Sequence, residues 1–163
     1  ISNSLYGHSF FDKQLAQRGI DLSQGRGNLE LMLKKVEAIV SQDYLVVSKN
    51  EKISSVIKKM SQSNNSEAYC LDKNGKFLGK CKLSEIASVA KSKAITGFLE
   101  KEPTSIKLDA SILQAIEVAS DFVGESIPVI SRLDGRLAGV VTEADIFQAY
   151  MSTQVKINDL ERR

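Results

Sequence analysis

The chain has 163 residues, of which 42% are hydrophobic and 26% are charged, and its formal net charge is +2 at pH 7. This length allows one good core or two small cores that share a face, and the composition is that of an ordinary soluble protein. The small charge and the scattered Lys and Arg residues argue against nucleic acid as a partner, and no apolar run approaches the roughly 18 residues that cross a bilayer. Because the chain starts at Ile1 instead of Met, we expect a longer parent protein.

Residues 1–40 predict a linker followed by a helix. The first part has an irregular apolar stripe and ends in the flexible sequence SQGRG at Ser23–Gly27. From Asn28, a residue that can cap a helix, apolar residues recur at helical spacing as far as Val40.

Residues 41–91 predict a strand, a helix, two strands joined by a tight turn, and a short helix. Tyr44–Val47 read as the first strand, and Ser48 or Asn50 can cap the helix that follows. Asn74–Gly75 lie between two apolar runs, which is a strong hairpin signal.

Residues 92–151 repeat this order of elements. Asp109 or Ser111 can cap the first helix of the repeat, and Thr142–Tyr150 read as its closing helix. The two copies are offset by 59 residues at the first helix and by 60 from the second strand onward, as a diverged duplication with one loop slip would leave. Residues 152–163 are polar, and we expect a frayed tail.

The sequence offers no evident catalytic or metal-binding group. Cys70 and Cys81 lie inside apolar runs without a CxxC motif, so we interpret them as reduced core residues in a reducing compartment. The two G-x-x-x-G stretches, at residues 75–79 and 135–139, fall at turns and strands and are not phosphate-binding fingerprints. With no nucleophile–base pair or metal cluster in the sequence, we do not expect an enzyme.

Each copy carries G-x-x-x-G followed by two apolar residues, and the second copy adds T-x-x-D within IPVISRLDGRLAGVVTEADI at Ile127–Ile146. This pattern resembles the CBS domain, and two copies in tandem resemble a CBS domain pair, or Bateman module, over residues 41–150. The resemblance implies an α+β fold with pseudo-two-fold symmetry, in which small sheets are backed by helices. CBS pairs commonly form dimers, and the homodimer expected here would use helix faces such as Ile146, Phe147 and Tyr150.

The opening segment carries a second resemblance. Asn3–Tyr6 and Gln14–Ile20 look like the stretch that follows the last membrane helix in CLC chloride channels and chloride/proton exchangers. This resemblance implies a regulatory domain on the cytoplasmic side of the cell membrane, attached to the membrane portion of its own parent chain and modulating gating or assembly. Two alternatives remain open: an adenine-nucleotide-sensing CBS module of another transporter or soluble regulator, and a ligand-free dimerisation scaffold.

The CBS resemblance also implies a binding site for an adenine nucleotide, with ATP, ADP or AMP as a regulatory ligand and no required cofactor. In nucleotide-binding CBS copies, the Asp of T-x-x-D takes ribose hydroxyls and the Thr takes phosphate, and Thr142 and Asp145 match these positions. Further ligand contacts are implied for Val140, for Leu45 in the leading strand of the first copy, and for Asn65 in the loop before its second strand.

Elementary chemistry leaves two interpretations of Thr142 and Asp145 open. A carboxylate accepts two hydroxyl donors, and a helix N-terminus tolerates a phosphate. The same two residues can form a capping box, which is worth about 1 kcal/mol without any ligand. The first copy has Lys82 and Glu85 in their places, so the sequence predicts one equipped cleft, near Thr142, with Glu125 adding negative charge to it.

Overall fold

The computed structural model describes residues 25–162, with side chains described from residue 29 onward, so the segment that resembles CLC proteins lies outside the described residues. Two short elements precede the first copy: α2 (Gly25–Leu33) and a 3-10 turn, η1 (Val36–Ile39). The first copy contains β1 (Val46–Ser48), α3 (Ile53–Ser63), β2 (Glu67–Leu71), β3 (Phe77–Lys82) and α4 (Leu83–Ile86). After η2 (Ile95–Phe98), the second copy contains β4 (Ile106–Lys107), α5 (Ile112–Ser120), β5 (Ile127–Ile130), β6 (Leu137–Val141) and α6 (Glu143–Glu161).

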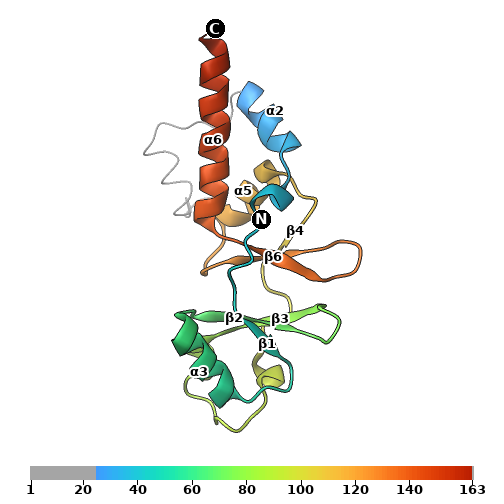
Figure 1. Ribbon diagram of the computed structural model, residues 1–163, viewed down its shortest axis with the longest axis vertical. Helices are drawn as coiled ribbons and strands as arrows, with labels where there is room; N and C mark the ends of the chain where they lie inside the picture. The colour runs from blue at the N-terminus through green and yellow to red at the C-terminus, as the bar shows by residue number, and fades with distance from the viewer. Residues whose placement is uncertain (1–24, 163) are drawn as a thin grey trace, which may run out of the picture.

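The two copies have the same sheet topology. Each forms a three-stranded sheet, ordered β1-β2-β3 or β4-β5-β6, in which the first pair of strands is parallel and the second antiparallel. Figure 1 shows the sheets stacked on each other, with α3 outside the first sheet and α2, α5 and α6 outside the second. The predicted α+β fold with pseudo-two-fold symmetry is confirmed. Within the described residues, no helix is both long and apolar enough to span a membrane.

The central strand of each sheet is buried on both faces. In β5 all four residues are buried, and in β2 only the last is partly exposed. The outer faces pack on the helices of their own copy, whereas the inner faces meet in a cluster made by Tyr69, Ile130, Leu137 and Val140. Continuous apolar runs are typical of strands that are covered from both sides, so each sheet needs the other copy to complete its burial.

The segment that precedes each copy packs on the other copy. Val36 in η1 is fully buried in the core of the second copy, and Ile95 in η2 is fully buried in the core of the first. Isolated backbone bridges join Lys35 to Ser111 and Lys52 to Ala94, and the 59-residue offset relates these two contacts to each other. Each hydrophobic core therefore contains residues from the segment that precedes the other copy.

The same exchange explains why the β6 strand contains Gly139. Ser41 pairs with Val140 through both backbone groups, at 2.8 and 3.0 Å, so the chain crosses directly over Gly139. A Cβ at Gly139 would lie 2.5 Å from the Ser41 carbonyl oxygen, and the residue has φ +152°. Its counterpart Gly79 has φ +151°, and a Cβ there would lie 2.7 Å from the Glu100 carbonyl oxygen. At both crossings the close backbone approach requires glycine.

Helix boundaries differ from the prediction in two places near the start. The helix expected to continue to Val40 ends at Leu33, because the following backbone pairs with the N-terminal end of α5. Asn28 lies inside α2 and does not cap it. The start of α3 is not capped by Ser48 or Asn50, since its N-cap is Lys52, without a side-chain cap bond. The predicted cap at Ser111 is confirmed as a capping box with Gln114.

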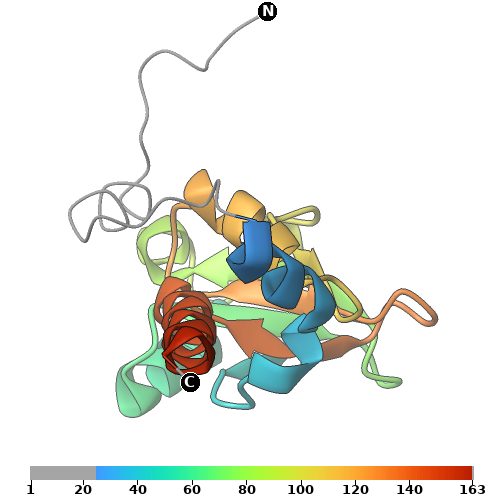
Figure 2. The same cartoon turned by 90° about the horizontal axis from the view of Figure 1, so that it is seen from above.

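The closing helix also differs from the prediction. α6 continues to Glu161, where the sequence led us to expect a frayed tail, because α2 packs beside it and Thr153 is buried. Figure 2 shows α6 nearly end-on beside α2. Ile146 and Tyr150 lie in the core of the second copy, with exposed fractions of 0% and 2%, so the expected dimer face at these residues is wrong.

The prediction that both cysteines are core residues is confirmed. Cys70 and Cys81 are both buried and free, and they pack in the core of the first copy. Burial raises the pKa of the Cys81 thiol to about 12, so this thiol is not a nucleophile near neutral pH.

The glycine crossing gives the first testable prediction. Gly139→Ala should lower the free energy of unfolding by about 1–3 kcal/mol, because the added methyl group meets the backbone that crosses β6. Gly97→Ala is the control, since nothing lies within 4 Å of a Cβ at that residue, and it should change stability by less than about 0.5 kcal/mol. Urea denaturation measures both values, and equal effects of the two variants would contradict the exchanged packing.

Candidate functional site

A first cleft opens beside the junction of β3 and α4, with walls from both copies and a volume of about 530 Å³. One wall comes from the first copy and the other from the loop that precedes β5 of the second copy. The lining residues are Ser66, Glu67, Lys82, Leu83, Ser84, Ala87, Val123, Gly124 and Glu125. The cleft therefore lies at the first-copy counterpart of the Thr142–Asp145 motif.

The chemistry of the first cleft is mixed. Lys82 offers a cation, but it makes no side-chain cap bond to α4, as expected for a residue that cannot accept from a backbone amide. Glu125 lies across from it and accepts a hydrogen bond from the Ser66 amide at 3.3 Å. The sequence placed Glu125 in the cleft near Thr142, and this placement is wrong: the carboxylate belongs to the cleft of Lys82, where it opposes a bound phosphate.

A buried polar network lies next to this cleft and reaches its lining at Glu67. Lys80 Nζ lies 3.1 Å from Glu67 Oε1, and the exposed fractions of the two side chains are 2% and 4%. The backbone amide of Ser126 donates to Glu67 Oε2 at 3.3 Å, and its carbonyl oxygen lies 3.5 Å from Lys80 Nζ. Tyr69 Oη lies 2.6 Å from Ser126 Oγ. The strands of the first copy thereby hold the second-copy loop that forms the opposite wall of the cleft.

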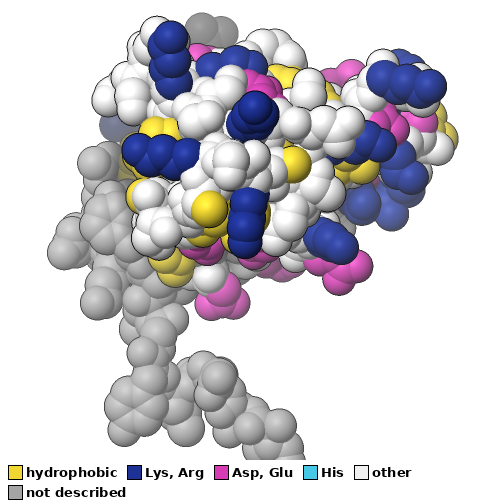
Figure 3. Space-filling model, turned by 90° about the horizontal axis from the view of Figure 1, so that it is seen from below, with side chains coloured by type: hydrophobic (Ala, Val, Ile, Leu, Met, Phe, Trp, Pro, Cys, Tyr) yellow, Lys and Arg dark blue, Asp and Glu magenta, His cyan; other side chains and the backbone are white. Residues whose placement is uncertain are grey.

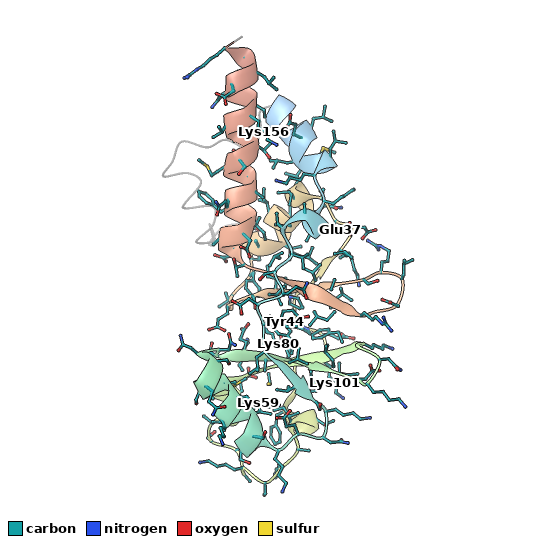
Figure 4. All side chains as sticks on the ribbon, viewed as in Figure 1. Glu37, Tyr44, Lys59, Lys80, Lys101 and Lys156 are labelled. Atoms are coloured by element: carbon teal, nitrogen blue, oxygen red, sulfur yellow. The ribbon has the colours of Figure 1, made fainter. Side chains whose placement is uncertain are left out.

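This ion pair breaks the symmetry between the copies. The residues equivalent to Glu67 and Lys80 are Ile127 and Val140, which are both apolar and buried. Figure 4 shows Lys80 and Tyr44 between the two sheets. The sequence did not predict this buried pair, because a lysine in a strand ordinarily extends to solvent. The apolar residue at the equivalent position of the repeat is the signal that marks Lys80 as inward-facing.

At the equivalent position of the second copy, where the sequence predicts a second cleft, Thr142 and Asp145 form a complete capping box at the start of α6. Asp145 Oδ2 accepts from the amide and the hydroxyl of Thr142, each at 2.8 Å, and Thr142 Oγ1 accepts from the Asp145 amide at 3.1 Å. The capping interpretation is confirmed. Every hydrogen bond of the Asp145 carboxylate to another described residue uses Oδ2, and the residue is half-buried. Oδ1 can still accept from a ligand, so capping and ligand binding do not compete for the same oxygen.

The other three predicted ligand contacts lie in different surroundings. Asn65 is the counterpart of Glu125 in the repeat, so the pseudo-two-fold places it opposite Thr142, and its Nδ2 donates to Ser63 Oγ at 2.9 Å. Leu45 packs on the core of the first copy. Val140 has an exposed fraction of 2%, and both its backbone groups pair with Ser41. In this arrangement Val140 is closed to a ligand.

The comparisons with known proteins agree with this geometry. Residues 95–152 match the CBS domain family model. The fold resembles that of a CBS domain pair/ACT domain protein from Thermotoga maritima, with a TM-score of 0.65 and 19% identity over 72% of this chain and 97% of that one. No curated protein matches the chain by sequence.

Two further solved structures show the range of proteins with this fold. The cytosolic domain of the Mg²⁺ channel MgtE in complex with ATP has a TM-score of 0.65 and 16% identity, over 76% of this chain and 53% of that one. A CBS-pair protein from Arabidopsis thaliana has a TM-score of 0.63 and 14% identity, over 74% of this chain and 96% of that one. The fold is thus that of CBS domain pairs.

The buried ion pair gives the second testable prediction. Lys80→Met leaves the Glu67 carboxylate buried without its partner, and should lower the free energy of unfolding by roughly 3–5 kcal/mol. The double variant Glu67→Leu/Lys80→Met gives the first copy apolar residues at these two positions, as in the second copy. It should regain most of the lost stability. Thermal and urea denaturation measure both; a Lys80→Met variant as stable as the unmodified chain would show that the pair contributes nothing.

Proposed function

Since residues 95–152 match the CBS domain and most of the chain has the fold of a CBS domain pair, we propose that it is a regulatory module that binds an adenine nucleotide in a second cleft, next to Thr142 and Asp145. The observation that carries the proposal is the Asp145 capping box, in which the hydrogen bonds to Thr142 use Oδ2 and leave Oδ1 available to a ligand. Asp145 Oδ1 would accept ribose hydroxyls, and the Thr142 end of α6 would lie nearest the phosphates.

A nucleotide in this cleft would act by stabilising one arrangement of the copies. The second cleft joins the start of α6 to the first-copy loop that contains Asn65. A ligand that contacts both walls binds best where the walls stand at the right separation, and it shifts the population toward that arrangement. The first cleft is a weaker candidate, because Glu125 faces Lys82 across it.

We further propose that the module is the cytoplasmic regulatory domain of a CLC-type chloride channel or chloride/proton exchanger, where it modulates gating or assembly. Support comes from the sequence of Asn3–Tyr6 and Gln14–Ile20, and from the use of the same fold in the cytosolic domain of the Mg²⁺ channel MgtE. The expected homodimer would then use faces other than Ile146 and Tyr150, and Leu33 and Leu160 are exposed apolar residues on α2 and α6. Membrane helices encoded upstream of Ile1 would support this parent; an enzyme domain there would contradict it.

A ligand-free scaffold is the second candidate function. It is favoured by the fact that Thr142 and Asp145 satisfy each other's backbone amides, so that their presence in the sequence needs no ligand. A nucleotide-sensing module of another transporter or of a soluble regulator would use the same cleft and differs only in its parent chain.

Calorimetry with ATP, ADP and AMP tests nucleotide binding. Asp145→Ala should weaken binding at least tenfold, because it removes the ribose acceptor, and should also cost about 1 kcal/mol of stability through the lost cap. The matched control is Gln114→Ala, which removes the equivalent residue of the α5 capping box and should leave nucleotide affinity unchanged. Absence of heat with all three nucleotides would favour the scaffold, and binding unaffected by Asp145→Ala would exclude the second cleft.

A further inference from the structure

The two copies differ in charge far more than the net charge of the chain suggests. The first copy together with the η2 segment that packs on it, residues 41–101, carries eleven lysines, no arginine and six acidic residues, whereas residues 102–151 carry three basic and eight acidic residues. Figure 3 views the molecule from the first-copy end, and Lys and Arg side chains are spread across this face, with Asp and Glu mainly toward its edges. The fold therefore gathers positive charge at one end.

Four of these lysines lie on two adjoining backbone segments, and we call them the lysine cluster: Lys49, Lys52, Lys91 and Lys93. Lys52 forms a backbone bridge with Ala94, and the first two amides of α3 donate to the carbonyl oxygens of Lys93 and Lys91 at 2.9 and 3.1 Å. The exchange of leading segments thus brings together lysines that lie about forty residues apart in the sequence.

The side chains of the lysine cluster are exposed, and the ion pairs among described residues do not involve them. The nearest acidic groups are already engaged. Glu51 accepts from Ser55 and pairs with Lys59 at 2.7 Å, and Asp72 accepts two backbone amides of its own turn. Lys93 Nζ lies 5.8 Å from the ring centroid of Phe98, which leaves its charge uncompensated. The four positive charges of the cluster therefore form no salt bridge with a described residue, although Lys49 helps to lower the pKa of the Asp72 carboxyl.

The acidic second copy is a poor complement for these charges. Asp109 pairs with Arg132 at 3.1 Å and Asp134 with Arg136 at 3.6 Å, while Asp145 is held in its capping box. Head-to-tail association of two chains through these three carboxylates would have to break these contacts. The unmatched charge of the lysine cluster instead fits a partner outside the molecule.

The residue type indicates which anionic partner is favoured. Lysine is a strongly hydrated point charge, whereas arginine is the residue suited to bidentate recognition of a particular phosphate or base. All basic residues of residues 41–101 are lysines, and this part of the chain forms one end of the molecule. Such an arrangement suits attraction to a surface that carries many anionic groups. Each lysine near an anionic bilayer raises the membrane partition coefficient roughly fivefold.

We propose that the lysine cluster docks the first-copy end of this protein on the anionic lipid headgroups of a bilayer. The inference rests on the membrane-attached location proposed above and not on nucleotide binding. In this orientation the second copy and α6 point away from the membrane, because they lie at the opposite end of the molecule (Figure 1). Docking at this end would connect the arrangement of the two copies to the membrane surface.

Vesicle co-sedimentation of the 163-residue chain, without nucleotide, tests the proposal. The chain should bind vesicles of phosphatidylcholine and phosphatidylserine but not phosphatidylcholine alone, and binding should fall as the NaCl concentration rises. Replacing the four residues of the lysine cluster by Gln should lower the partition coefficient on the order of 100-fold. The matched control replaces Lys73, Lys76, Lys107 and Lys156 by Gln, which changes the net charge equally and should lower it by less than about fivefold.

Three results would overturn the proposal. Equal losses in the two quadruple variants would mean that overall charge, and not the lysine cluster, attracts the vesicles. Calorimetric binding of inositol hexakisphosphate by the cluster, without vesicle binding, would assign it to a soluble anion. Sedimentation velocity showing a low-salt dimer that disappears in the lysine-cluster variant, again without vesicle binding, would assign it to a second copy. Loss of nucleotide binding alone would leave vesicle binding unaffected, so the two proposals fail separately.

Discussion

The structure depends on one constraint: the central strand of each sheet is buried on both faces, and a single copy has helices for only one of them. The inner faces of the two sheets therefore bury each other around Tyr69, Ile130 and Val140. The exchange of η1 and η2 strengthens the dependence, because each outer core also takes residues from the segment before the other copy. A copy separated from its partner would expose one sheet face and lose part of its remaining core.

The first cleft follows from this packing, since its walls come from both copies, yet duplication has not left the equivalent positions of the two copies equal. The first copy has Glu67 and Lys80 where the second has Ile127 and Val140, and Lys82 where the second has Thr142. The buried pair of Glu67 and Lys80 binds the loop before β5 to the first sheet, because Glu67 also accepts from the Ser126 amide. This interaction holds one wall of the first cleft in place. The second cleft instead carries a capping box with one unused carboxylate oxygen.

Local sequence signals predicted the repeat, the hairpin turns and the Ser111 and Thr142 caps, because turn chemistry and capping depend on a few neighbouring residues. Features that need long-range contacts were missed. Ile146 and Tyr150 read as a dimer face because the sequence does not state which helix side meets the core. Polar residues 152–161 read as a tail because their partner, α2, lies more than a hundred residues away. Lysines that look scattered in the sequence become a cluster only when the leading segments cross.

The central claim is that the two copies form one cooperative unit, and native-state hydrogen exchange tests it most directly. Amides of β2 and β5 that exchange only by unfolding report on the first and second copy separately. The account predicts a single opening free energy for both strands, which falls by the same amount in each when urea is added. Exchange of one strand at a clearly lower free energy, while the other stays protected, would show that a copy unfolds alone and would contradict the mutual burial on which both clefts depend.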